Sequence, residues 1–158
     1  YMLSQINEKI QDGYTVLKLK IGAIDWDKEI GLLKSIRSQY GDKLQVRVDA
    51  NGAFDESQIR EVLKALRDLN IHSIEQPIEK GNEELMRLLC AEEILPIALD
   101  EELIGVYGFD EKRQLLRKIM PQYIILKPSL HGGIYGCYEW IELAGSLGIK
   151  WSLQSFTR

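Results

Sequence analysis

Short apolar runs rich in β-formers alternate with amphipathic helical stretches along the whole 158-residue chain. The alternation predicts six strands, at 15–21, 44–49, 73–75, 97–100, 123–127 and 150–154. Apolar residues at helical spacing predict helices at 3–11, 27–39, 56–69, 83–91, 109–118 and 134–146. Asp25 and Asp55 are the expected N-caps of the second and third helices. Because no linker rich in proline, glycine or serine interrupts the series, we expect one βα domain.

The predicted strands end on polar residues that recur at a nearly constant spacing. They are Lys20, Asp49, Glu75, Asp100, Lys127 and Ser155, and successive members are 25 to 29 residues apart. One βα unit, with its strand, crossover helix and two loops, needs about that many residues. We therefore expect these side chains at the carboxyl ends of successive parallel strands, where α/β enzymes build their sites.

A barrel accounts for this series better than an open doubly wound sheet. In a doubly wound sheet the strand order reverses at a switch point, so five consecutive strand ends would not converge on one small volume. A complete (β/α)₈ barrel at about 27 residues per unit needs about 216 residues. We therefore predict an α/β fold over residues 1–158, a single incomplete TIM-barrel domain that holds the second to seventh parallel strands.

Composition narrows the class of protein. The chain is 45% hydrophobic and 28% charged, and its formal net charge is −4, which is typical of a globular domain and argues against a nucleic-acid partner. No apolar run approaches the roughly 18 residues that cross a bilayer, and the first residues lack signal-peptide features. We expect a cytoplasmic protein with no membrane partner. Cys90 and Cys137 lack a C-x-x-C spacing and are expected to be free core thiols.

Three carboxylates, Asp49, Glu75 and Asp100, are predicted at adjacent strand ends and face one mouth. Such anions repel one another unless a cation lies among them or they share protons. A hard divalent ion with oxygen ligands resolves the repulsion, which predicts Mg²⁺, with Mn²⁺ as the alternative ion. A single acid could equally cap a helix or pair with a surface lysine. Three acids in register favour the metal site.

Lysines flank these acids. Lys18 and Lys20 are two residues apart on one strand, so both point to the same face. Their mutual repulsion in a barrel mouth favours proton loss from one of them, which suits a general base, whereas a solvated edge strand is the alternative. Lys127 ends a strand on the other side of the acids. A base on each side of a bound carbon acid suits proton transfer α to a carboxylate, with a divalent ion stabilising the enolate.

These motifs resemble the enolase superfamily, and within it the muconate-lactonising subgroup. The resemblance is carried by Lys18-Leu19-Lys20, Asp49-Ala50-Asn51, Glu75-Gln76-Pro77, Leu99-Asp100-Glu101 and Leu126-Lys127-Pro128-Ser129. The segments 18–25, 71–78 and 96–105 are most similar to the o-succinylbenzoate synthases of the Bacteroidetes kind. The resemblance covers essentially the whole chain.

The resemblance implies a reaction on a small carboxylate substrate. The reaction is the Mg²⁺-dependent dehydration of a cyclohexadiene carboxylate to aromatic 2-succinylbenzoate in menaquinone synthesis. Lys20 would be the base, Lys18 the neighbour that tunes it, and Lys127 the cation or second acid/base on the opposite side. The implied metal ligands are Asp49, Glu75 and Asp100. The residues expected to orient these groups or to contact substrate are Asn51, Glu101, Ser129 and Ser155.

Three alternatives remain open at this stage. Dipeptide epimerases and N-acylamino-acid racemases of the same superfamily are the close ones. An alternative of another class is a non-catalytic barrel fragment that forms a homo-oligomer through its open sheet edges. The resemblance also implies an N-terminal capping domain and an eighth strand, both expected to be absent here, and Phe156-Thr157-Arg158 departs from the family pattern. His131, in the loop after the strand at 123–127, is expected to be structural.

Overall fold

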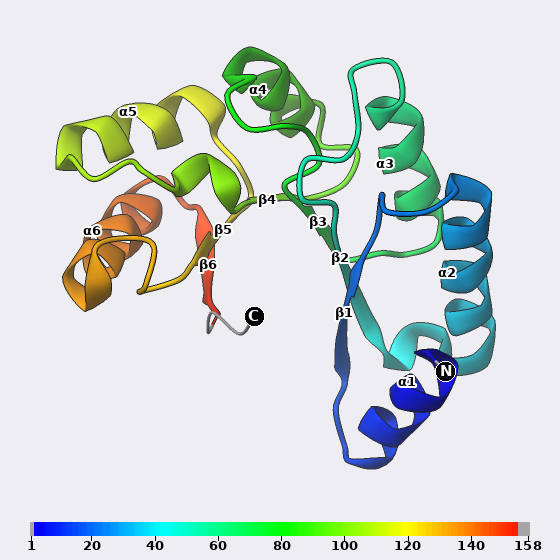
Figure 1. The fold of residues 1–158 in the computed structure, drawn as a ribbon. Coiled ribbons are helices and arrows are strands. Elements are labelled where there is room, and N and C mark those ends of the chain that lie inside the picture. The colour runs from blue at the N-terminus through cyan, green and yellow to red at the C-terminus, as the bar shows by residue number, and fades with distance from the viewer. Residues whose placement is uncertain (1, 155–158) are drawn as a thin grey trace.

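The structure, a computed structural model, describes residues 2–154, with side chains from Gln5 onward. Six parallel strands form one sheet whose order follows the chain. They are β1 (Val16–Lys20), β2 (Gln45–Asp49), β3 (Ser73–Glu75), β4 (Ile97–Leu99), β5 (Tyr123–Leu126) and β6 (Lys150–Leu153). The sheet curls into a half-barrel (Figure 1), which confirms the predicted fold class. β1 and β6 are its edges, and association through these edges stays a prediction.

Helices cover the convex side of the curled sheet (Figure 1). Those that follow the strands are α2 (Trp26–Tyr40), α3 (Ile59–Asp68), α4 (Glu83–Glu92), α5 (Phe109–Ile119) and α6 (Gly133–Ser146). α1 (Met2–Gln11) precedes β1, and its Asn7 accepts hydrogen bonds from Gln39 and Tyr40 at the end of α2. Two short 3₁₀ helices are η1 (Gly41–Lys43) and η2 (Glu101–Leu103). Within residues 2–154 none of the helices is long and apolar enough to cross a membrane.

The hydrophobic core lies between the sheet and these helices. Alternate strand residues point outward and are fully buried there, among them Val46, Val48, Ile74, Ile97, Leu99, Ile124 and Leu126. Because side chains alternate along a strand, the residues between them face the concave side, where charged and polar groups gather. Cys90 and Cys137 are free and buried, as predicted. The concave side therefore carries the polar strand-end side chains together with a few apolar ones, Val16, Ala98 and Ile125.

The start of α3 differs from its prediction. The helix begins at Ile59 rather than at residue 56. Asp55 does accept hydrogen bonds from nearby donors, but these are the backbone and hydroxyl of Ser57 and the backbone of Gln58. These backbone N–H groups are the ones that an N-cap side chain satisfies, and the carbonyl of Asp55 accepts from Ile59 at 3.0 Å. Asp55 thus caps this end of the chain segment as predicted, although the regular helix begins three residues later than expected.

The cap of α2 also differs from its prediction. Asp25 occupies the N-cap position, but its side chain makes no capping hydrogen bond. Glu29, one turn into the helix, accepts hydrogen bonds from the backbone N–H groups of Gly22, Ala23 and Ile24. This carboxylate is 5% exposed. The loop that follows β1 is therefore held by a glutamate that reaches back from the helix.

Close packing of α6 on the loop after β5 predicts a strong effect at Gly136. A Cβ atom at Gly136 would lie 1.7 Å from the carbonyl oxygen of His131, so either helix or loop must shift. We expect Gly136→Ala to lower the free energy of unfolding by about 2 kcal/mol or more. Gly145, on the same helix, has nothing within 4 Å of the corresponding position. Gly145→Ala should therefore raise stability by up to about 1 kcal/mol.

Urea unfolding of the 158-residue chain measures both values. The two substitutions add the same methyl group to one helix, so their difference isolates the close contact. Equal stability of the Gly136→Ala and wild-type chains would contradict that contact.

Candidate active site

The predicted acids lie at the carboxyl ends of neighbouring strands, on the concave side. Lys20 is the register partner of Asp49, and Asp49 is the register partner of Glu75. Asp100 lies two residues beyond Ala98, which pairs with Glu75. Because this offset is even, Asp100 points to the same face as the others. A stagger of this kind is expected where a sheet closes into a barrel.

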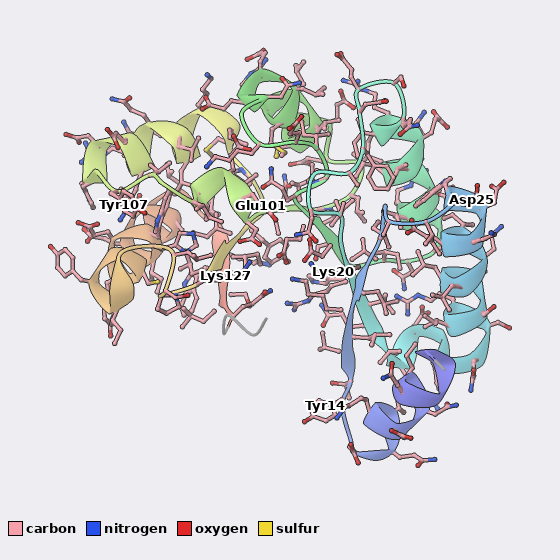
Figure 2. All side chains as sticks on the ribbon, in the orientation of Figure 1. Tyr14, Lys20, Asp25, Glu101, Tyr107 and Lys127 are labelled. Carbon is pink, nitrogen blue, oxygen red and sulfur yellow. The ribbon has the colours of Figure 1, made fainter. Side chains whose placement is uncertain are left out.

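Lys127 continues the same stagger just beyond the end of β5. It lies four residues beyond Tyr123, whose register partner on β4 is Ala98. Figure 2 shows Lys20 and Lys127 on opposite sides of the concave opening, with Glu101 between them. The two lysines therefore stand on either side of the carboxylate row.

Lys18 lies among the carboxylates. Its Nζ atom is 2.7 Å from Glu75 Oε2 and 3.1 Å from Asp49 Oδ2. It also donates a hydrogen bond to Gln154 Oε1 at 3.2 Å. Burial lowers the pKa of Lys18, but the ion pairs with Glu75 and Asp49 outweigh burial, so the pKa is raised. Lys18 is therefore a cation that links two of the acids, a contact that sequence analysis did not foresee.

The negative charge of Glu75 is disfavoured in this arrangement. Its side chain is 5% exposed. Burial and the negative charge of Asp49 raise the pKa of Glu75 to about 7, even though Lys18 acts in the opposite direction. Asp49 also lies 3.5 Å from Lys20, so Lys18 and Lys20 together face Asp49 and Glu75. Even so, burial and Asp49 disfavour the charged form of Glu75 where the acids converge.

Lys127 forms an ion pair with the buried carboxylate of Asp100. The backbone N–H of Lys127 donates to Nδ1 of His131 at 2.8 Å. His131 is fully buried, and burial lowers its pKa, which favours the neutral ring. These contacts support a structural role for His131, which holds the backbone that carries Lys127.

Asn51 and Glu101, expected to orient other groups, are joined to Lys20. Lys20 Nζ donates to Asn51 Oδ1 at 2.5 Å, and Asn51 Nδ2 donates to Glu101 Oε1 at 2.7 Å. Asn51 has a φ of 45°, a left-handed conformation that asparagine tolerates better than most residues. The Lys20 side chain is 72% exposed, so a bound molecule can reach its amine.

The structure gives little information on the roles of the two predicted serines, Ser129 and Ser155. Ser129 is exposed in the turn after β5. Ser155 lies outside the described residues. Gln154, just before Ser155, was missed by sequence analysis, and its Nε2 donates to Glu75 Oε2 at 3.4 Å. The available signal was its place at the end of a strand, the same signal that selected the acids.

The donor set suits a hard divalent cation. Among the described residues no three acidic, histidine or cysteine side chains stand close enough together to hold a metal as they are. Lys18 and Lys127 contact the carboxylates instead. Glu75 Oε1 and Asp100 Oδ1 are nevertheless buried without a hydrogen-bond partner. Unpaired carboxylate oxygens on neighbouring acids are the groups that Mg²⁺ prefers, so the residues fit this ion.

Comparison with known sequences agrees with the resemblance. Residues 1–157 match the profile of the family described as Enolase C-terminal domain-like. An o-succinylbenzoate synthase from Desulfotalea psychrophila is 50% identical over 156 residues, which cover 98% of this chain and 42% of that protein. An L-Ala-D/L-Glu epimerase from Francisella tularensis subsp. novicida is 28% identical over 149 residues, which cover 93% of this chain and 41% of that protein.

Solved structures give the same result. The crystal structure of MenC from Desulfotalea psychrophila matches with a TM-score of 0.93 at 47% identity, over 99% of this chain and 43% of that one. The muconate lactonizing enzyme from Pseudomonas putida matches with a TM-score of 0.81 at 29% identity, over 90% of this chain and 39% of that one. The chain thus spans about two fifths of the length of these relatives. With its half-barrel, its row of strand-end acids and these matches, the chain belongs to the enolase C-terminal domain-like family of the enolase superfamily.

Proposed function

We propose that this chain forms the catalytic half-barrel of a Mg²⁺-dependent o-succinylbenzoate synthase. The observation that carries the proposal is the row of charges across the barrel mouth, in which Lys20 and Lys127 stand on either side of three carboxylates. The 50% identity to an o-succinylbenzoate synthase supports this activity over that of the epimerase, which is 28% identical.

Asp49, Glu75 and Asp100 would hold the metal ion. When bound, Mg²⁺ supplies positive charge that binds the substrate carboxylate and stabilises the negative charge that develops on it. The acids suit this role because they are buried, lie at the ends of three neighbouring strands, and leave Glu75 Oε1 and Asp100 Oδ1 without a hydrogen-bond partner.

Lys20 would remove the proton α to the substrate carboxylate. Its amine is exposed at the end of β1 and is oriented by Asn51, which Glu101 holds in turn. A general base must be neutral when it accepts the proton.

Lys127 would act from the opposite side. Its side chain is 16% exposed and is held by Asp100 and by the loop that His131 supports. As a cation it would stabilise the enolate left after the proton has gone to Lys20. The C–O bond on the neighbouring carbon would then break, the protonated Lys20 would return its proton to the departing hydroxyl group so that water leaves, and the ring would become aromatic. The stability of the aromatic product drives this step.

An epimerase of the same superfamily is the second candidate function. It is favoured by the same placement of Lys20 and Lys127, because inversion at one carbon needs an acid/base on each side of the substrate. The 28% identity to an L-Ala-D/L-Glu epimerase also supports this second candidate.

Turnover of defined substrates tests the proposal. The longest protein that the gene encodes, supplied with Mg²⁺, is expected to convert the cyclohexadiene carboxylate to 2-succinylbenzoate, followed by the absorbance of the aromatic ring. A panel of dipeptides and N-acyl amino acids, followed by polarimetry, should show little turnover. An Asp49→Asn variant purified in parallel reveals any contaminating activity. Turnover of dipeptides alone would overturn the synthase proposal in favour of an epimerase.

A further inference from the structure

Gln76, which directly follows Glu75, ties together the loops after β3 and β4. Its Oε1 accepts hydrogen bonds from the backbone N–H groups of Asp100 at 3.3 Å and of Glu102 at 3.2 Å. Its Nε2 donates to the carbonyl of Ile78 and to Glu102 Oε2, each at 3.1 Å. All the hydrogen-bonding positions of this amide are thus used. The side chain is fully buried.

The backbone of Gln76 extends these connections to the neighbouring strands. Its N–H donates to the carbonyl of Ala98 on β4 at 2.9 Å. Its carbonyl accepts from Gly52, in the turn that follows Asp49, at 2.8 Å. The φ angle of Gln76 is 39°, a conformation that a non-glycine residue keeps only where its surroundings hold it. One residue therefore contacts the segments that carry all three acids.

Glu102 links Gln76 to the loop that follows β3. It lies in η2, is 3% exposed, and its Oε1 accepts a hydrogen bond from the backbone N–H of Gly81 at 3.0 Å. Its Oε2 accepts from Gln76. We name this pair, Gln76 and Glu102, the buried clasp. Both side chains are buried beneath the loops, so they do not contact a molecule in the mouth.

We propose that the buried clasp sets the spacing of Asp49, Glu75 and Asp100 and thereby the affinity and selectivity of the site for Mg²⁺. The inference rests on the proposed function, because it takes these acids as metal ligands. They belong to separate strands, and their relative positions depend on how the loops are tied together. Mg²⁺ requires near-ideal octahedral geometry at short distances, whereas Ca²⁺ accepts longer and more variable ones. Loosened spacing should therefore weaken Mg²⁺ binding more than Ca²⁺ binding.

Calorimetric titration of the 158-residue chain with Mg²⁺ and with Ca²⁺ tests the proposal. Gln76→Ala should lower the Mg²⁺ affinity about 10-fold or more, the range seen when partners behind a metal ligand are removed. The Ca²⁺ affinity should fall less, so the ratio of the two affinities changes. Circular dichroism establishes that each variant is folded at the temperature used. If Gln76→Ala does not fold, Glu102→Ala tests the same clasp.

Gln122 offers a matched control. Its Oε1 accepts from the backbone N–H of Ile97 at 3.0 Å, and its Nε2 donates to the carbonyl of Cys90 at 3.1 Å. It therefore ties two segments together as Gln76 does, but at the opposite end of β4. Gln122→Ala should lower the melting temperature while leaving the Mg²⁺ affinity within about twofold of wild type. Equal losses of affinity in the two glutamine variants would overturn the proposal.

Exchanging the two side-chain types, with glutamate at position 76 and glutamine at position 102, tests whether the Mg²⁺ affinity can be rescued. Gln76→Glu places two carboxylates against each other and should lower the Mg²⁺ affinity. Adding Glu102→Gln restores a donor opposite an acceptor between the two side chains and should recover part of that affinity, because the carbonyl of Ile78 still lacks its donor. No recovery would count against the clasp. A wild-type chain that binds no Mg²⁺ would overturn the proposed metal site together with this inference. Normal binding by both wild type and Gln76→Ala would overturn this inference alone.

Discussion

Replacing Lys20 by alanine is expected to slow removal of the α-proton by about 10² to 10⁴-fold, the usual contribution of a general base. The affinity for Mg²⁺ should be unchanged, because Lys20 makes only a long contact with Asp49. Its amine lies 3.5 Å from the Asp49 carboxylate, whereas the amine of Lys18 lies 3.1 Å from it. The effect would thus fall on proton transfer rather than on metal binding.

Lys20→Arg separates charge from basicity. The guanidinium keeps the positive charge but stays protonated in proteins, so it cannot accept the α-proton. This variant should be nearly as impaired as Lys20→Ala. If a positive charge at the end of β1 were all that the reaction required, Lys20→Arg would instead retain most of the activity.

Both variants are measured in the longest protein that the gene encodes. NMR follows exchange of the α-proton with solvent deuterium, and absorbance follows the aromatic product. Lys34→Ala, an exposed lysine on α2, is the matched control and should behave as wild type. Exchange at the wild-type rate in Lys20→Ala would contradict the assignment of Lys20 as the base.

Glu75→Gln is expected to abolish Mg²⁺ binding while it stabilises the metal-free chain above about pH 7. The loss of a ligand should lower Mg²⁺ affinity by at least about 100-fold, because even partners behind a ligand contribute 10 to 100-fold. The gain in stability follows from the pKa of Glu75, which burial and Asp49 raise from an ordinary 4.5 to about 7. Lys18 acts in the opposite direction, but burial and Asp49 outweigh it, so the environment on balance favours the neutral carboxyl group.

The sign of the pH dependence follows from this raised pKa. Between pH 4.5 and about 7 the folded chain keeps a proton on Glu75 that the unfolded chain has lost. The free energy of unfolding of the metal-free wild type should therefore fall as the pH rises through this window, by up to about 3 kcal/mol. Glutamine cannot lose a proton, so the variant should lack this decrease.

Urea unfolding in EDTA at about pH 5 and about pH 8 measures the difference, and calorimetry measures Mg²⁺ binding. Glu142→Gln, an exposed glutamate on α6, is the matched control and should change neither quantity. A parallel pH dependence in wild type and Glu75→Gln would show that other groups govern stability. Retained Mg²⁺ affinity in the variant would remove Glu75 from the ligand set.

Much of the architecture could be predicted because it depends on local patterns. Alternation with period two placed Lys18 and Lys20 on one face of β1, and the structure has them on the concave side. The spacing of about one βα unit between polar residues anticipated that Lys20, Asp49 and Glu75 would lie side by side in register. These are properties of a strand and its connection, so neighbouring residues determine them.

Helix caps were less predictable. Asp25 and Asp55 have the side chains of good caps, yet only Asp55 accepts hydrogen bonds from the backbone ahead of its helix. Several donors and acceptors compete for the same few backbone groups at a helix end. Which of them succeeds depends on how the preceding loop packs, as Glu29 illustrates where it binds residues 22–24.

By itself, then, the sequence determined the order of strands and helices, the face on which each strand-end residue lies, and the family to which the chain belongs. Only the tertiary structure decided that Lys18 bridges Asp49 and Glu75, that Glu75 has a pKa of about 7, and that Gln76 holds Glu102. The reason is physical. A hydrogen bond or ion pair between residues 26 to 57 positions apart, and the burial that shifts a pKa, depend on how separate strands and loops are brought together, which no local pattern encodes.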